Sequence, residues 1–202
     1  MAYSDFTLEQ VLDQFQITSS TSTFPLPSIA PTPELAATLK RYLPLATSIS
    51  TEKARNELIV APILLEVRTL FQDQISYFSG RTLTVDPGVG LNGECDFLLS
   101  ADTNQTVVQS PIVVIVEAKN ADLAGGLGQC AAQMVGAHRF NDRRGHPYPI
   151  YGAVTTGTNW KLLTLTYPHL NISLEEYLVP PQLSLVLGFL AEPFQAFFQA
   201  SP

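Results

Sequence analysis

Apolar residues follow two different spacings along this chain, and the change of spacing separates helical from extended segments. Up to about residue 71 they recur every three or four positions, which is typical of helices packed on a core. From Arg81 the spacing is that of strands, and it becomes helical again near Gly125 and near Pro180. The order of helices, three strands, a helix, two strands and a helix predicts an α/β or α+β domain with a mixed central sheet.

The first third of the chain is expected to hold three helices and one polar connector. Thr32 stands at a cap position and Pro33 at a first helical position, while Ser4 or Asp5 is expected to cap the first helix. Pro62 is expected to kink or divide the third helix, because proline removes a backbone donor. The expected helices cover residues 4–14, 33–42 and 50–71, and the connector covers residues 19–32.

The second part of the chain contains the predicted sheet. One segment, 112–119, is apolar at both parities and therefore reads as a central strand covered on both faces. A Thr-Gly-Thr-Asn turn at 156–159 predicts a hairpin, and the segments 125–139 and 180–199 read as helices, the latter broken at Pro193. The expected strands are 83–85, 94–99, 112–119, 150–156 and 160–166.

Composition places the chain among folded proteins and sets limits on its partners. With 202 residues and 46% hydrophobic positions, it can bury the core of one domain, so intrinsic disorder is excluded. The formal charge of −7 is unlike that of proteins that bind nucleic acid by charge alone. The two cysteines make no disulfide framework, and the sequence shows no signal peptide and no apolar run of membrane-spanning length. The expectation is a cytoplasmic protein with reduced thiols and no membrane partner.

The candidate chemistry lies at the end of the central strand. Glu117 and Lys119 are two residues apart and so project from the same face, while Asp96 interrupts the apolar strand before them. Charges at the end of so apolar a strand cost free energy unless each finds a partner or a metal. If the two strands pair as a hairpin, Asp96 lies beside Glu117, and two carboxylates with a backbone carbonyl suit Mg²⁺.

The arrangement of Asp96, a gap of twenty residues and then Glu117-Ala118-Lys119 resembles the motif of the PD-(D/E)XK, or restriction-endonuclease-like, nucleases. A preceding helix with Glu57 and a following helix with Gln129 and Gln133 fit the same order. The resemblance covers residues 51–166 and implies a mixed central sheet flanked by helices. In this interpretation one domain, 1–202, holds an N-terminal helical extension (1–50), a nuclease-like core (51–166) and a C-terminal strand and helix segment (167–202). Cys95 precedes Asp96 where the family commonly has proline.

The resemblance implies a Mg²⁺- or Mn²⁺-dependent hydrolase of phosphodiester bonds, with DNA as its partner. Asp96, Glu117 and the carbonyl of Ala118 would hold the metal, and Lys119 would assist the attacking water. Glu57 would act through water or a second metal, and Gln129 would orient groups in the site. Chemically, attack on a phosphodiester concentrates negative charge, which a divalent cation and a cationic side chain stabilise.

Several of these residues also have an ordinary structural interpretation. Glu57 shares a helical segment with other glutamates, most of which are expected to be exposed, and Glu94 reads as a solvated strand end. Trp160 reads as packing rather than as a base-stacking platform. Arg139, Arg143 and Arg144 are expected on the rim of the same cleft as phosphate contacts, although a solvated helix end has the same appearance.

Two other functions remain open beside the nuclease. One is a binding or regulatory protein that keeps the fold without catalysis, and the other is a subunit of a larger restriction-type complex whose DNA affinity lies in another chain. A homodimer also stays open. A basic cleft leading to Lys119 would favour the enzyme, and an acidic rim would favour the alternatives.

Overall fold

In a computed structural model the chain forms one mixed sheet of eight strands with helices on both faces, and residues 1–200 are described. The strand order is β1-β7-β6-β5-β4-β3-β2, with β8 paired to β6. Two neighbouring pairs, β1–β7 and β4–β5, are parallel and the others are antiparallel. The strands are β1 Thr18–Ser22, β2 Ser76–Thr82, β3 Glu94–Ser100, β4 Ile112–Ala118, β5 Ile150–Thr155, β6 Asn159–Thr166, β7 His169–Ser173 and β8 Tyr177–Leu178.

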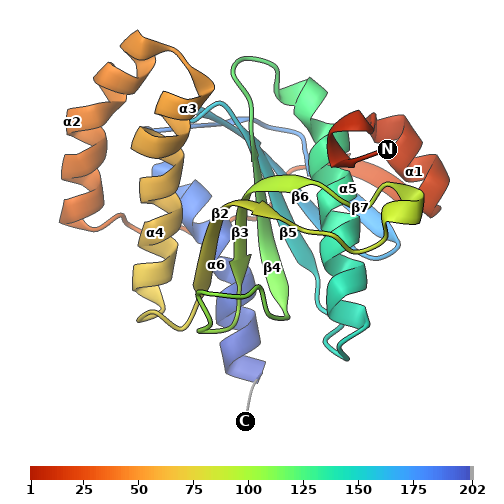
Figure 1. The fold of residues 1–202 in the computed structure, drawn as a ribbon. Helices are drawn as coiled ribbons and strands as arrows, with labels where there is room; N and C mark the ends of the chain where they lie inside the picture. Colours follow the sequence, from red (N-terminus) through yellow and green to blue (C-terminus); the bar gives the residue numbers. More distant parts are fainter. Residues whose placement is uncertain (201–202) are drawn as a thin grey trace.

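The helices divide between the two faces of the sheet (Figure 1). On one face α5 packs on β4 and β5 and is itself covered by η1 and α1. On the other face lie α6, which also packs on β4 and β5, and the layer formed by α2, α3, η2 and α4. The helical bounds are η1 Tyr3–Asp5, α1 Leu8–Phe15, α2 Pro33–Ile49, α3 Glu52–Arg55, η2 Asn56–Val60, α4 Ala61–Leu70, η3 Pro87–Val89, α5 Leu123–Asp142 and α6 Leu183–Ala200.

The mixed α/β class predicted from the sequence is confirmed. The strand predicted to be central, β4, lies inside the sheet and is covered on both faces, as its apolar sequence indicated. Every residue of β4 is buried, because one hydrophobic core fills the α5 face of the sheet and a second fills the α6 face. Trp160 is fully buried, and its indole N–H donates to the carbonyl of Gly157 at 3.0 Å, so the packing interpretation of this residue is confirmed. Cys95 and Cys130 are both free and buried.

The N-terminal fifty residues differ from the expected helical extension. The first helix is capped by Thr7 rather than by Ser4 or Asp5, since the Thr7 hydroxyl accepts from the backbone of Gln10 at 3.3 Å. Part of the expected connector is strand β1, which pairs in parallel with β7. Its Thr-Ser-Ser-Thr-Ser sequence carries no apolar alternation, so only the pairing with a strand 150 residues later makes it extended.

The helix expected over 50–71 is divided in an unexpected way. Between α3 and α4 the segment η2 forms a turn of π-helix, in which the N–H of Ala61 donates to the carbonyl of Asn56. This widened turn lies directly before Pro62, whose ring has no N–H to continue the α-helical pattern. Pro62 therefore changes the type of helix without ending it.

Two further predictions are wrong at the level of single elements. Residues 83–85 are not a separate strand: they follow β2, Ser76–Thr82, as an irregular continuation in which the backbone N–H groups of Leu83 and Val85 donate to the carbonyls of Gly93 and Leu91, both at 2.9 Å. The break expected at Pro193 is absent, because α6 runs through this buried proline from Leu183 to Ala200. By length and composition α6 could cross a membrane, but half of its residues are buried inside the fold.

Candidate active site

The regular backbone pairing of β3 with β4 ends just before the predicted site, and the side chain of Asp96 makes the next hydrogen bond between the two strands. The last regular pair is Phe97 with Val116, and beyond it Oδ2 of Asp96 accepts from the backbone N of Ala118 at 2.8 Å. On the other side of β3 the pairing with β2 omits Asp96 and Gly80, and Gly80 has a φ of +60°. Glycine adopts this conformation without steric cost, which allows β2 to bend at the residue opposite Asp96.

Glu117 is the most buried charged group of the site. Its side chain is 2% exposed, yet both carboxylate oxygens have a partner. Oε1 accepts from Nζ of Lys119 at 2.8 Å, and Oε2 accepts from Nε2 of Gln133 at 2.8 Å. These contacts compensate for part of the cost of burying a carboxylate.

Helix α5 contacts Lys119 through the side chain of Gln129. Nζ of Lys119 donates to Oε1 of Gln129 at 2.9 Å. Gln129 lies one helical turn before Gln133 on α5. The helix approaches this closely because residue 126 is glycine: a Cβ there would lie 2.5 Å from a methyl group of Val154 and 3.0 Å from Cγ of Lys119. The structure therefore places Lys119 in contact with both Glu117 and Gln129.

Burial and mutual repulsion change the acidity of the two carboxyl groups. Burial first, and then the charge of Asp96, raise the pKa of Glu117 to about 7 against an ordinary value of 4.5. Burial also raises the pKa of Asp96, opposed by its hydrogen bond with Ala118 and by the charge of Lys119. Burial lowers the pKa of Lys119, but its contact with Glu117 outweighs this and raises the pKa overall, so the ammonium stays charged at neutral pH.

A cavity of about 370 Å³ opens beside Asp96, between β2, β3 and the helical segment of α3 and η2. Four carboxylate side chains and one lysine contribute to its lining, so the rim is acidic. Glu94 is exposed, as expected. The charged lining residues are Glu52, Lys53, Glu57, Glu94 and Asp96.

Glu57 lines the cavity but does not join the two carboxylates. Its side chain is 63% exposed, and one of its oxygens lies 4.0 Å from Nζ of Lys53. Within residues 1–200, no group of three or more His, Cys, Asp or Glu side chains is placed to hold a metal ion. The structure thus brings together two of the carboxylates predicted to act on the metal, Asp96 and Glu117, and Glu57 is not positioned as a third.

Two carboxylates nonetheless fit a hard cation. Mg²⁺ keeps several waters and is commonly held by one or two carboxylates together with substrate oxygens. The neighbouring charges of Asp96 and Glu117 raise the free energy of the doubly ionised pair, and a divalent cation would remove that repulsion. The predicted role of the Ala118 carbonyl stays a prediction, since only the N–H of Ala118 has a contact that bears on the site.

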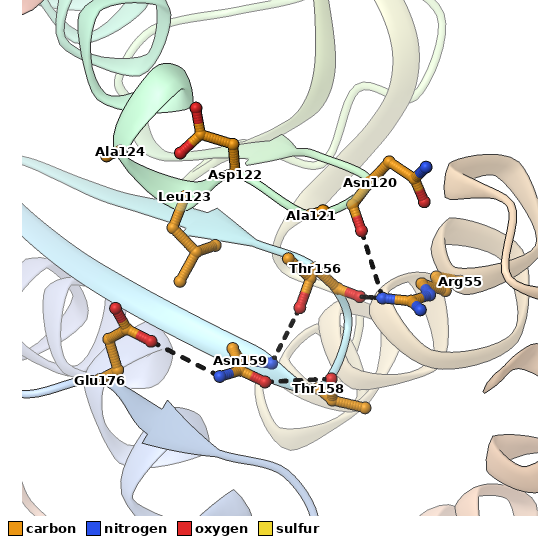
Figure 2. Close-up of a pocket in the computed structure, with 10 residues that line it drawn as sticks. All are labelled: Arg55, Asn120, Ala121, Asp122, Leu123, Ala124, Thr156, Thr158, Asn159 and Glu176. Carbon is orange, nitrogen blue, oxygen red and sulfur yellow. Dashed lines mark hydrogen bonds between the residues drawn. The ribbon is translucent and has the colours of Figure 1, made fainter.

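A second cavity, of about 460 Å³, begins at the residue after Lys119 (Figure 2). Arg55 crosses one side of it and donates to the carbonyl oxygens of Asn120 and Thr156, both at 3.3 Å. The guanidinium thereby joins α3 to the end of β4 and to the β5–β6 turn. Asp122 and Glu176 also line this cavity, so it presents both signs of charge.

The three arginines expected on the rim lie elsewhere, and this prediction is wrong. Arg139 is ten residues beyond Gln129, or about 15 Å along α5, and its guanidinium pairs with Asp86 at 3.0 Å. Arg143 donates to the carbonyl of Val85 at 2.6 Å, and the Arg144 guanidinium stacks 3.6 Å from the centre of the Phe140 ring. Helix α5 runs away from the site toward this end (Figure 1), where Arg139 and Arg143 bind the β2–β3 connection and Arg144 packs on α5 itself.

Sequence reasoning missed two residues that shape the site. Gly126 permits the close approach of α5, and a signal existed in the glycine-rich start of that helix. Glu52 raises the pKa of Lys119 through its charge, but nothing in the sequence distinguishes it from Glu57, five residues later.

Comparison with known proteins adds no relative. No protein-family model, no curated protein and no solved structure matches the chain.

Proposed function

We propose that the protein is a restriction-endonuclease-like hydrolase that cleaves phosphodiester bonds of DNA with Mg²⁺ or Mn²⁺. The observation that carries the proposal is the convergence of Asp96, Glu117 and Lys119 at one end of the central sheet. Asp96 accepts a hydrogen bond from the backbone N–H of Ala118, the residue between the other two, and Lys119 donates a hydrogen bond to Glu117. The sheet and its flanking helices agree with the architecture that the sequence motif implies.

Each residue has a defined task in this proposal. Asp96 and Glu117 would hold the cation, which would supply charge stabilisation at the phosphate and help to activate the attacking water. Lys119 remains protonated at neutral pH, so it acts as a donor that orients the attacking water and stabilises charge on the phosphate, not as a base. Gln129 fixes the position of the Lys119 ammonium.

The cleavage assay uses plasmid and linear DNA with Mg²⁺ or Mn²⁺ and includes EDTA as the metal-free arm. Lys119→Ala should lower the cleavage rate by about 10²–10³ while Mn²⁺ remains bound, because the carboxylates are still present. Asp96→Asn should abolish both cleavage and tight binding of Mn²⁺. Lys40→Ala, on the exposed surface of α2, is the matched control and should cleave at the wild-type rate.

The acidic lining of the cavity beside Asp96 favours a second candidate, a non-catalytic binding or regulatory protein of the same fold. Four carboxylates against one lysine repel the phosphates of a duplex. In that case the protein binds Mn²⁺ and cleaves neither DNA nor RNA. Cleavage that survives both Asp96→Asn and Lys119→Ala would contradict the proposed nuclease site.

A further inference from the structure

Gln133 is a buried polar residue whose side-chain hydrogen bonds go to the candidate site. It is fully buried on α5, within a helix that otherwise presents mostly apolar and small residues to the sheet. Nε2 donates to Oε2 of Glu117 at 2.8 Å and to the backbone carbonyl of Glu94 at 3.4 Å. Its amide group therefore reaches both strands that carry the proposed metal ligands.

The orientation of this amide is fixed by its neighbours. The backbone carbonyl of Glu94 can only accept, as does the Glu117 carboxylate when it is ionised, so the NH₂ group faces Glu94 and Glu117. The other end of the amide, Oε1, is buried and has no hydrogen-bond partner among residues 1–200. An unpaired buried acceptor costs free energy, so the residue is not explained by stability of the helix alone.

The position of Gln133 matters because the backbone ladder has ended there. Beyond the pair of Phe97 and Val116, regular pairing no longer holds β3 and β4 together. Two side-chain contacts remain, Asp96 to the N–H of Ala118 and the bridge made by Gln133. Gln129 holds Lys119 one turn earlier, so a single helix face fixes the ammonium and the carboxylate together.

We infer that Gln133 is a positioning residue for the metal site, setting the orientation of the Glu117 carboxylate and the spacing between β3 and β4. The inference rests on the proposed function, because it assigns Glu117 as a ligand of Mg²⁺ or Mn²⁺. Gln133 itself touches neither metal nor substrate in this assignment. Partners of this kind around a metal site typically affect its affinity by about 10–100-fold when they are replaced.

The test measures Mn²⁺ affinity by calorimetry on the full chain, with circular dichroism to verify folding. Gln133→Met keeps the length of the side chain and removes the donor, and it should weaken Mn²⁺ binding by about 10–100-fold. Gln129→Met, one turn away, loses a contact with Lys119 only and should change Mn²⁺ affinity by less than about threefold. If Gln133→Met does not fold, Gln133→Asn, one methylene too short to reach Glu117, takes its place with the same expectation.

A double-mutant cycle separates positioning from general packing. Because Glu117→Ala removes a proposed ligand and with it tight Mn²⁺ binding, the cycle is measured as the free energy of unfolding in EDTA: Gln133→Met should cost less stability in the Glu117→Ala background than in the wild type, since no carboxylate is left to hold. An equal loss of stability in both backgrounds would show that Gln133 acts by packing and would overturn the inference. Unchanged affinity in folded Gln133→Met would also overturn it, while leaving the proposed function intact. Wild-type protein that binds no Mn²⁺ would overturn the proposed function and this inference together.

Discussion

Glu117 and Lys119, two residues apart on β4, form an ion pair of 2.8 Å in which the carboxylate is 2% exposed and the ammonium 27%. The carboxylate is thus enclosed by protein while the cation still reaches solvent. Such an arrangement places a partly exposed positive charge beside a buried, titratable carboxyl group. Its consequences can be measured even without substrate.

The first prediction concerns stability against pH in EDTA. The pKa of folded Glu117, about 7, lies above its ordinary value of 4.5, so its contribution is fully present below pH 4.5 and is lost as pH rises through 7. The loss amounts to about 3 kcal/mol in the free energy of unfolding. Urea unfolding from pH 4.5 to 8 should show this decline in the wild type and a flatter profile in Glu117→Gln. Parallel profiles would show that Glu117 does not titrate in this range; Glu34→Gln, on the exposed surface of α2, serves as control.

The second prediction concerns the approach of α5 to β4. A methyl group added at Gly126 would meet Val154 and Lys119, and the helix must move to admit it. Gly126→Ala should therefore lower the free energy of unfolding by about 1–3 kcal/mol, despite the better helix propensity of alanine. It should also reduce DNA cleavage by displacing Lys119. Gly145→Ala is the control for replacing a glycine by alanine where no atom lies within 4 Å of the added methyl group. Its φ of +75° adds backbone strain but no steric contact. A stabilised Gly126→Ala protein would contradict the observed packing.

The third prediction separates Glu57 from the two buried carboxylates. Because Glu57 is exposed and lies near Lys53, Glu57→Gln should change Mn²⁺ affinity by less than about threefold. Asp96→Asn should weaken the same binding by more than about 100-fold, since it removes a direct ligand. Calorimetric titration of both variants decides the matter. A comparable loss in the two would mean that Glu57 moves into the site when the cation binds.

The fourth prediction concerns the arginines at the far end of α5. Replacing Arg139, Arg143 and Arg144 by alanine should leave the salt dependence of DNA binding unchanged, because their partners are Asp86, Val85 and Phe140. The same change should accelerate hydrogen exchange at the tip of the β2–β3 hairpin and cost about 1 kcal/mol of stability. A reduced salt slope would show that these residues contact phosphates after all.

Local patterns in the sequence were enough to predict the class of the fold and the shared orientation of Glu117 and Lys119. A strand with apolar residues at both parities can be stable only between two covered faces, and this identified β4 as central. Residues two apart on a strand share a face, so the spacing alone predicts that Glu117 and Lys119 lie together. The spacing of Gln129 and Gln133 likewise put both on one side of a helix.

How these parts meet depends on contacts between segments that are far apart in the sequence. β1 has no apolar pattern of its own and is extended because β7 offers a free edge, a contact between residues about 150 positions apart. The three arginines lie at and just beyond the end of the helix that begins near Gln129, and the rise of that helix carries them away from the site; Arg139 and Arg143 bind Asp86 and Val85 in the β2–β3 connection. The bond from Asp96 to Ala118 and the acidity of Glu117 depend on where the β3–β4 ladder ends and on burial from both faces. Neither is a property of the local sequence, because both arise from segments that approach each other only when the chain is folded.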